Sequence, residues 1–262
     1  MSDAFEQALE KLSASKKYAG VCPDTLKRVL TECFQRHKKP KDAEKAAREK
    51  LHGITGAFMS AEEFKRASAA LNNCAKGDED ALIEVLSQHA STRERLPLTA
   101  MDALYQQIFA ITGKPEKILD LACGLNPIYL AARGYDVTGV DIQNPAIELV
   151  NRMGAENGMP VRGKCADLLI PGSIPQEHFS LAIAFKLLPL LETQRTGAAA
   201  ETLLAIDADY TAVSFPTRTL TGRNVGMEAN YTRWMEAHLP AEREVVARFV
   251  ETNELVYILK AV

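Results

Sequence analysis

Hydrophobic side chains recur every three to four residues through the first hundred or so positions of this chain. On a helix that spacing places them on one face, as in amphipathic helices that bury one side. The segment 23–37 is an example, because it opens with Pro-Asp and carries Leu26 and Leu30 on the same face. This part of the chain shows no strand pattern. The predicted helices span residues 4–13, 23–37, 41–51, 61–71, 80–89 and 100–111.

Beyond Gly113-Lys114-Pro115 the pattern changes to short, β-rich apolar runs that alternate with helical segments. Such alternation predicts a parallel sheet with right-handed crossovers. The last two runs, 245–251 and 254–259, are separated only by Thr252-Asn253, which indicates an antiparallel hairpin. The other predicted strands span 117–121, 136–140, 159–165, 181–185 and 210–214, with helices at 127–133, 145–156 and 188–204.

The change of pattern near residue 113 predicts two domains. Residues 1–112 form a smaller all-helical domain, and residues 113–262 form an α/β domain. A parallel sheet that ends in an antiparallel hairpin is similar to the Rossmann-like fold of S-adenosylmethionine (SAM)-dependent methyltransferases, more than to a nicotinamide-binding domain. This likeness of folds is an analogy and does not by itself assign a function.

Composition predicts the cellular compartment and reveals one asymmetry in the distribution of charge. With 47% hydrophobic and 25% charged residues the chain is typical of globular proteins. It has neither a signal-peptide pattern nor an apolar run of bilayer length, so we expect a cytoplasmic protein without a membrane segment. Residues 11–50 carry twelve basic and five acidic side chains, a net charge of +7, whereas the whole chain has −3. This basic segment is either a solvated helical face or an arm that binds phosphates, and its composition alone favours neither.

The turn 122–126 joins a predicted strand to a predicted helix that starts at Asn126-Pro127. It contains one glycine, Gly124, where a dinucleotide-binding turn has G-x-G-x-x-G, and this argues against NAD. A SAM site requires only close approach of the backbone, for which Ala122 and Gly124 suffice. A turn without a ligand is the alternative. The preceding acid, Asp120, is expected to be structural more than chemical.

Two further acids follow the next two predicted strands. Asp141 comes at the carboxyl end of the second strand, where open α/β sheets bind the ribose of a nucleoside. Asp167 follows the third strand, where it can accept from an adenine amino group while the Leu168 N–H meets a ring nitrogen. Either acid alone could merely cap the next helix. Two such acids after a glycine turn favour a nucleoside cofactor.

Three further segments are weaker candidates. Residues 89–97 contain arginines that could clamp a carboxylate, or could simply lie in water beside a capped helix. The apolar run 185–192 is interrupted by Lys186, which needs a partner or water. The loop 214–227 has glycines and arginines and precedes Trp234, a combination that suits a nucleic-acid contact with a stacked base or, equally, a surface loop.

Taken together these segments resemble the aminoglycoside-resistance 16S rRNA (guanine-N7) methyltransferases over essentially the whole chain. The segments that carry the resemblance are Ser15–Tyr18, Cys22–Thr25, Leu51–Phe58, His89–Leu96, Leu121–Pro127, Phe185–Glu192 and Ser214–Met227. The resemblance implies SAM-dependent methylation of one guanine in the decoding-site helix of the small ribosomal subunit. Such methylation blocks 4,6-disubstituted deoxystreptamine drugs such as gentamicin and kanamycin.

The resemblance also implies roles for individual residues. Arg95 would hold the SAM carboxylate, Asp141 the ribose, and Asp167 with Leu168 the adenine. Val225 departs from the lysine of relatives, which puts a phosphate contact there in doubt. The cofactor-binding candidates are Phe58, His89, Ala90, Ser91, Arg95, Ala122, Gly124, Asp141, Asp167, Leu168 and Gln194. The residues expected to position the target base are Lys186, Glu192, Phe215, Arg223 and Trp234, and those expected to bind RNA are Lys16, Lys17, Lys27, Arg28, Arg36, Lys38, Lys39, Arg218 and Arg223.

Guanine N7 has an in-plane lone pair and no proton, so it can attack a sulfonium methyl group without a general base. We therefore expect catalysis by positioning, with the target base extruded and stacked on an aromatic side chain such as Trp234 or Phe215. We expect no metal, a monomer, and the small ribosomal subunit as partner. A SAM enzyme for small molecules and an RNA-binding module without activity remain the alternatives.

Overall fold

The computed structural model describes residues 3–55, 59–217 and 226–262 of the protein. Three helices come first and are separated by short turns: α1 (Asp3–Ser13), α2 (Pro23–Arg36) and α3 (Pro40–Thr55). Four more helices, two of them capped by Ser60 and Asp78, precede the sheet. They are α4 (Ala61–Cys74), α5 (Glu79–Ser87), α6 (Ala90–Arg93) and α7 (Leu98–Thr112).

The rest of the chain forms a seven-stranded sheet with the order β3-β2-β1-β4-β5-β7-β6. β1 to β5 are parallel, and the last two strands form an antiparallel hairpin, as predicted. The strands are β1 (Lys117–Leu121), β2 (Asp136–Asp141), β3 (Val161–Cys165), β4 (Phe179–Phe185), β5 (Ala208–Pro216), β6 (Arg243–Glu251) and β7 (Glu254–Ala261). The helices between them are α8 (Asn126–Ala132), α9 (Asn144–Asn157), α10 (Leu188–Gln194), α11 (Ala198–Ala205) and α12 (Met227–His238).

Strand order reverses between β1 and β4, which lie side by side although β2 and β3 separate them in sequence. Ligands of open α/β sheets bind at such a reversal, outside the carboxyl ends of the strands. The fold therefore places the turn after β1 at the position where a cofactor is expected.

One predicted element is wrong. The segment 188–204 forms two helices, because Gly197 takes a left-handed conformation with φ of 84°. The Glu192 carboxylate accepts from the Gly197 and Ala199 N–H groups at 2.8 and 3.1 Å, which caps the second helix.

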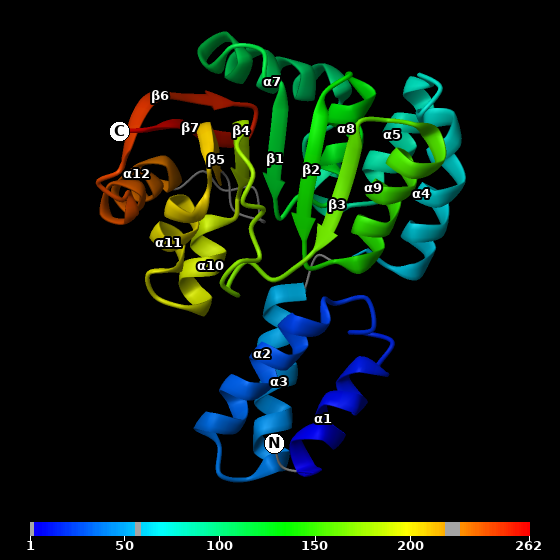
Figure 1. Ribbon diagram of the computed structural model, residues 1–262, viewed down its shortest axis with the longest axis vertical. Coiled ribbons are helices and arrows are strands. Elements are labelled where there is room, and N and C mark those ends of the chain that lie inside the picture. Colours follow the sequence, from blue (N-terminus) through cyan, green and yellow to red (C-terminus); the bar gives the residue numbers. More distant parts are fainter. Residues whose placement is uncertain (1–2, 56–58, 218–225) are drawn as a thin grey trace.

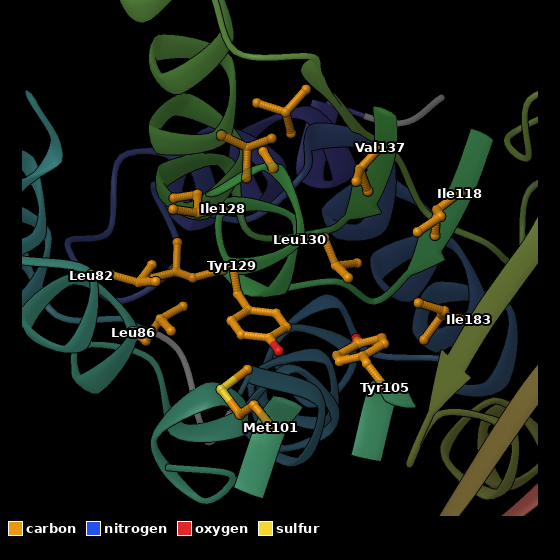
Figure 2. Close-up of a cluster of buried hydrophobic side chains, with 14 of the residues drawn as sticks. Leu82, Leu86, Met101, Tyr105, Ile118, Ile128, Tyr129, Leu130, Val137 and Ile183 are labelled. Atoms are coloured by element: carbon orange, nitrogen blue, oxygen red, sulfur yellow. The ribbon is translucent and has the colours of Figure 1, made fainter. Parts of the chain in front are cut away.

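The two faces of the sheet bury alternate residues of its strands. Ile118 and Ile183 pack on one face, against α4, α5, α7, α8 and α9. Leu119 and Ala184 pack on the other face, against α10, α11 and α12. Figure 2 shows the first of these cores, in which Tyr105 of α7 and Tyr129 of α8 stack with ring centroids 5.4 Å apart.

The helices α1, α2 and α3 have a core of their own, built from residues such as Leu12, Leu30 and Leu51. We refer to them, residues 3–55, as the docking unit. In Figure 1 this unit lies beneath the carboxyl ends of the parallel strands. Because α4 to α7 pack on the sheet instead, we propose that the domain boundary lies between residues 55 and 59. The division into domains 1–112 and 113–262, which rests on the sequence pattern, stays a prediction.

Among the described residues, no helix combines the length and the apolar character needed to cross a bilayer.

Candidate functional site

The turn after β1 brings the backbone close to two polar side chains. Ala122 and Gly124 both have left-handed conformations, with φ of 53° and 51°. The Gly124 N–H donates to Asp141 Oδ2 at 2.8 Å. A Cβ atom on residue 124 would lie only 2.5 Å from His89 Cε1, so a side chain here would force the buried His89 ring to shift. The conformation and the contact together require glycine here.

The two strand-end acids are both buried and both hydrogen-bonded. Asp141 ends β2, and its second oxygen, Oδ1, accepts from the Gln143 N–H at 2.8 Å. Asp167 follows β3; its Oδ1 accepts from the Leu169 N–H at 2.9 Å, and its Oδ2 from Arg28 Nε at 2.8 Å. Burial raises the pKa of the Asp141 carboxyl, although the N–H groups and His89 oppose this effect.

Both acids face one cleft at the carboxyl edge of the sheet. Its cavity volume is about 250 Å³ and its walls are mostly apolar. The docking unit contributes Arg28 and Ile54 to the lining, and α10 contributes Leu190, Leu191 and Gln194. Of the predicted cofactor residues, the described lining includes His89, Ser91, Ala122, Asp141, Asp167, Leu168 and Gln194.

His89 is held in the cleft wall by two side chains. Gln143 Oε1 accepts from the Met59 N–H at 3.1 Å, so its amide nitrogen faces His89 Nε2 at 2.9 Å. The Gln143 amide thus faces Nε2, while Nδ1 lies 2.8 Å from Ser91 Oγ and 3.4 Å from the Ser91 backbone nitrogen. Burial lowers the pKa of the His89 imidazole, with Asp141 opposing the shift. The neutral ring thus orients Ser91 beside the glycine turn.

Arg95 forms a buried ion pair that the sequence did not predict. Its Nε donates to Glu254 Oε1 at 2.6 Å, and its guanidinium stacks over the Phe185 ring, 4.8 Å from the centroid. Ser214 Oγ donates to the same carboxylate at 2.5 Å, and Lys186 Nζ lies 3.6 Å from it. Burial alone would raise the pKa of Glu254, but Arg95 and Lys186 lower it. Arg95, Ala90 and Gly124 are not among the described residues that line the cleft.

Comparison with known proteins decides the family. The family model described as "Ribosomal RNA methyltransferase (FmrO)" matches residues 14–258. The chain belongs to this family. It is 44% identical to the 16S rRNA (guanine(1405)-N(7))-methyltransferase of Serratia marcescens, with 98% of each chain covered. It is 30% identical to the protein of that name from Proteus mirabilis, over 97% of this chain and 96% of the relative.

Solved structures agree with this assignment. One similar structure is the crystal structure of the 16S rRNA methyltransferase RmtF in complex with S-adenosyl-L-homocysteine. Its sequence is 45% identical to this chain, the TM-score is 0.90, and the match covers 100% of both chains. The 16S rRNA methylase RmtB is 40% identical with a TM-score of 0.86 over 98% of each chain. The predicted family and the methyltransferase fold, with its parallel sheet and terminal hairpin, are therefore confirmed.

The residues predicted to position the target base of this methyltransferase lie in different environments. Lys186 leaves β4 and pairs with Glu94 at 2.7 Å, beside the cleft. The Glu192 carboxylate caps α11, which gives it a structural task. Trp234 is half-buried and stacks on His238 with ring centroids 4.1 Å apart. Phe215 is a correction: it is 0% exposed beneath Tyr231 and Trp234, so in this structure it cannot stack on a base.

The basic residues of the docking unit divide into two groups. Arg28 is 14% exposed and points into the cleft, where it pairs with Asp167. The other basic residues predicted to bind RNA are exposed on this unit or on the segments between its helices, and they are Lys16, Lys17, Lys27, Arg36, Lys38 and Lys39. Phe58, Arg218, Arg223 and the departure at Val225 lie outside the described residues. The part of the chain that the structure describes holds no cluster of three or more His, Cys, Asp or Glu side chains able to bind a metal ion.

Sequence reasoning missed Glu254 and Gln143, for related reasons. Glu254 stands 159 positions from Arg95 and is the first residue of a hairpin strand. Gln143 follows Asp141 in the turn before α9, and its contacts with Met59 and His89 come from other parts of the chain. A lone acid inside a buried strand is the one local clue, because it requires a partner.

Asp120 is buried under the glycine turn and gives a prediction for stability against pH. Its Oδ2 accepts from Asn126 Nδ2 at 2.6 Å. Burial raises the pKa of its carboxyl from 3.8 to about 7. Between these two values the folded protein binds more protons than the unfolded chain, so the free energy of unfolding falls as pH rises. We expect Asp120→Asn, which keeps the acceptor oxygen, to remove this dependence.

The measurement is chemical denaturation of both proteins at pH 5 and pH 8. The variant should gain about 3 kcal/mol relative to the wild type on going to the higher pH. Asp80→Asn, at an exposed position of α5, is the control and should run parallel to the wild type. Parallel curves for Asp120→Asn would contradict the assignment.

Proposed function

We propose that this chain transfers the methyl group of SAM to N7 of guanine 1405 in the 16S rRNA of the small ribosomal subunit. It would act in the cytoplasm as a monomer, without a metal, and would confer resistance to aminoglycosides. The observation that carries the proposal is the cleft with two buried carboxylates at neighbouring strand ends, beside a single-glycine turn, in a member of this rRNA methyltransferase family.

The residues of the cleft fit SAM. Asp141 is 6% exposed and both its oxygens already accept from backbone N–H groups, so it stays in place to accept from ribose hydroxyls through its remaining lone pairs. Asp167 and Leu168 are placed for the adenine edge, and the apolar wall of α10 for its face. Gly124 lets the turn approach His89 and Ser91, two of the residues that line the cleft.

Arg95, which is 7% exposed and is not part of the described cleft lining, remains the proposed partner of the methionine carboxylate because the family resemblance assigns it that role. Two of its nitrogens, Nε and Nη2, donate to Glu254, which fixes the plane of the guanidinium. An arginine held along one edge can offer its other edge to a carboxylate. In this proposal Glu254 positions Arg95 and, through Lys186, connects the cofactor side of the cleft with the target side.

When bound, SAM supplies an electrophilic sulfonium methyl group. The chain then has to bring guanine N7 into line with that group and keep water away. The N7 lone pair needs no proton removed, so neither Asp141 nor His89 is required as a base. We propose that Lys186, which directly follows β4, and Trp234 of α12 contact the extruded guanine. We also propose that the exposed lysines of the docking unit bind rRNA phosphates.

Primer extension on 16S rRNA tests this proposal. Small subunits are incubated with the protein and SAM, and their rRNA is treated with borohydride and aniline, which cleave the strand at N7-methylguanine. We expect one stop, at guanine 1405, that disappears when SAM is omitted. A stop at another nucleotide or no stop would contradict the proposal, and parallel reactions on bare 16S rRNA show whether the assembled subunit is the substrate.

A further inference from the structure

Arg28 stands apart from the other basic residues of the docking unit. It lies on α2, next to exposed Lys27, yet its guanidinium enters the cleft. Its Nε donates to Asp167 Oδ2 at 2.8 Å and its Nη2 donates to Gln194 Oε1 at 3.0 Å. The docking unit thus contributes a charged side chain to the part of the cleft where adenine is proposed to bind.

Each nitrogen of the guanidinium has one acceptor within the protein, so three of its five N–H groups are engaged. Its third nitrogen, Nη1, donates to Glu32 Oε1 at 3.0 Å, one turn further along α2. Glu32 also pairs with Lys50 of α3, so the position of Arg28 is fixed from two helices. With an acceptor for every nitrogen, Arg28 is arranged to hold protein groups in place and not to meet a phosphate.

Asp167 depends on this contact. The carboxylate is only 4% exposed, and it also accepts from the backbone N–H of Leu169. A buried carboxylate that loses its cationic partner is strongly disfavoured and will turn away. Such a change would alter the acceptor that Asp167 presents toward the cleft.

The docking unit is seated beside the same site by its backbone. The Cys22 N–H donates to the Ile142 carbonyl at 2.7 Å, and the Asn144 N–H donates to the Gly20 carbonyl at 2.8 Å. These bonds join the segment before α2 to the turn that follows Asp141. Both strand-end acids therefore have a neighbour in the docking unit.

We propose that Arg28 is a positioning residue of the cofactor site, which orients Asp167 and Gln194 and couples the seating of the docking unit to cofactor binding. This inference rests on the proposed function, because it presumes that the cleft binds SAM. By linkage, whatever stabilises the docking unit on the sheet also favours the bound cofactor, and the reverse holds equally.

The test compares Arg28→Ala with Lys27→Ala, its exposed neighbour on the same helix. For each variant, S-adenosylhomocysteine affinity is measured by titration calorimetry and small-subunit affinity by fluorescence polarisation over a range of salt concentrations. We expect Arg28→Ala to weaken cofactor binding by about tenfold or more, the loss expected for a charge-assisted hydrogen bond. The salt slope of subunit binding should stay unchanged. Lys27→Ala should leave cofactor binding unchanged.

Arg28→Lys guards against loss of folding, since it keeps the charge but cannot hold Asp167 and Gln194 with one planar group. We expect it to raise the KM for SAM while the KM for subunits stays constant. The inference is overturned if Arg28→Ala binds the cofactor as the wild type does, or if its salt slope falls by about 0.9, the signature of a lost phosphate contact. If the wild type makes N7-methylguanine and Arg28→Ala leaves cofactor affinity unchanged, this inference alone is refuted. If the wild type neither binds the cofactor nor methylates, the proposed function is refuted.

Discussion

Replacing Asp141 with asparagine is expected to weaken the binding of S-adenosylhomocysteine by at least about a hundredfold. A hydrogen bond to a charged group contributes about 1.5–3 kcal/mol, and asparagine removes the charge and leaves one acceptor oxygen where the carboxylate has two. The substitution also aims an amide N–H at the N–H of Gly124 or of Gln143, which now donate to the carboxylate. The glycine turn would therefore lose its shape, and the site would lose the negative charge of Asp141. Titration calorimetry measures the effect.

Asp136→Asn is the matched control, because Asp136 begins the same strand, β2, and pairs at the opposite edge of the sheet with Arg162. It should bind the cofactor as the wild type does. Circular dichroism of both variants checks that they fold. Unchanged affinity in a folded Asp141→Asn protein would remove Asp141 from the cofactor site.

Neutralising Lys16, Lys17, Lys38 and Lys39 together is expected to reduce small-subunit affinity by roughly two to three orders of magnitude near 0.1 M salt. All four side chains are exposed on the docking unit, outside its helices. Each phosphate contact contributes about 0.7–0.9 to the slope of log affinity against log salt concentration. The slope should therefore flatten by about 3, as measured between about 50 and 200 mM salt.

The control neutralises four basic residues at the amino edge of the sheet, Lys114, Lys117, Arg162 and Lys260. It removes the same number of charges, so a general effect of net charge would appear in both proteins. The quadruple docking-unit variant should keep its cofactor affinity, because none of its lysines lines the cleft. Equal salt slopes in the two variants would show that the docking unit does not bind the rRNA through these residues.

The local pattern was sufficient for most elements because each depends on its own residues. β1 was predicted with its observed bounds, and most other strands and helices were predicted within a few residues. The break of the long helix at Gly197 was missed, since a single glycine is tolerated inside helices unless the backbone must turn left-handed there. No helix was predicted for the segment that forms α12, which was described only as following a loop.

Charge and aromatic character were poorer guides to location. Arg28 looked like one more cation of a basic helix, but the turn of α2 aims it at Asp167 while Lys27 faces solvent. Phe215 looked like a stacking platform, but it lies on the strand face that α12 covers. In both cases the side chain's direction depends on which element packs against it.

By itself the sequence determined the strand and helix alternation, the single-glycine turn, the two strand-end acids and the family. Each of these depends on residues that are close together in short segments of the chain. Only the tertiary structure decided that α4 to α7 belong to the sheet's core, that Glu254 holds Arg95, and that Arg28 reaches the cleft. Each of these facts depends on contacts between residues far apart in the chain. Such contacts are set by how whole helices pack on a sheet, and a local pattern does not record them.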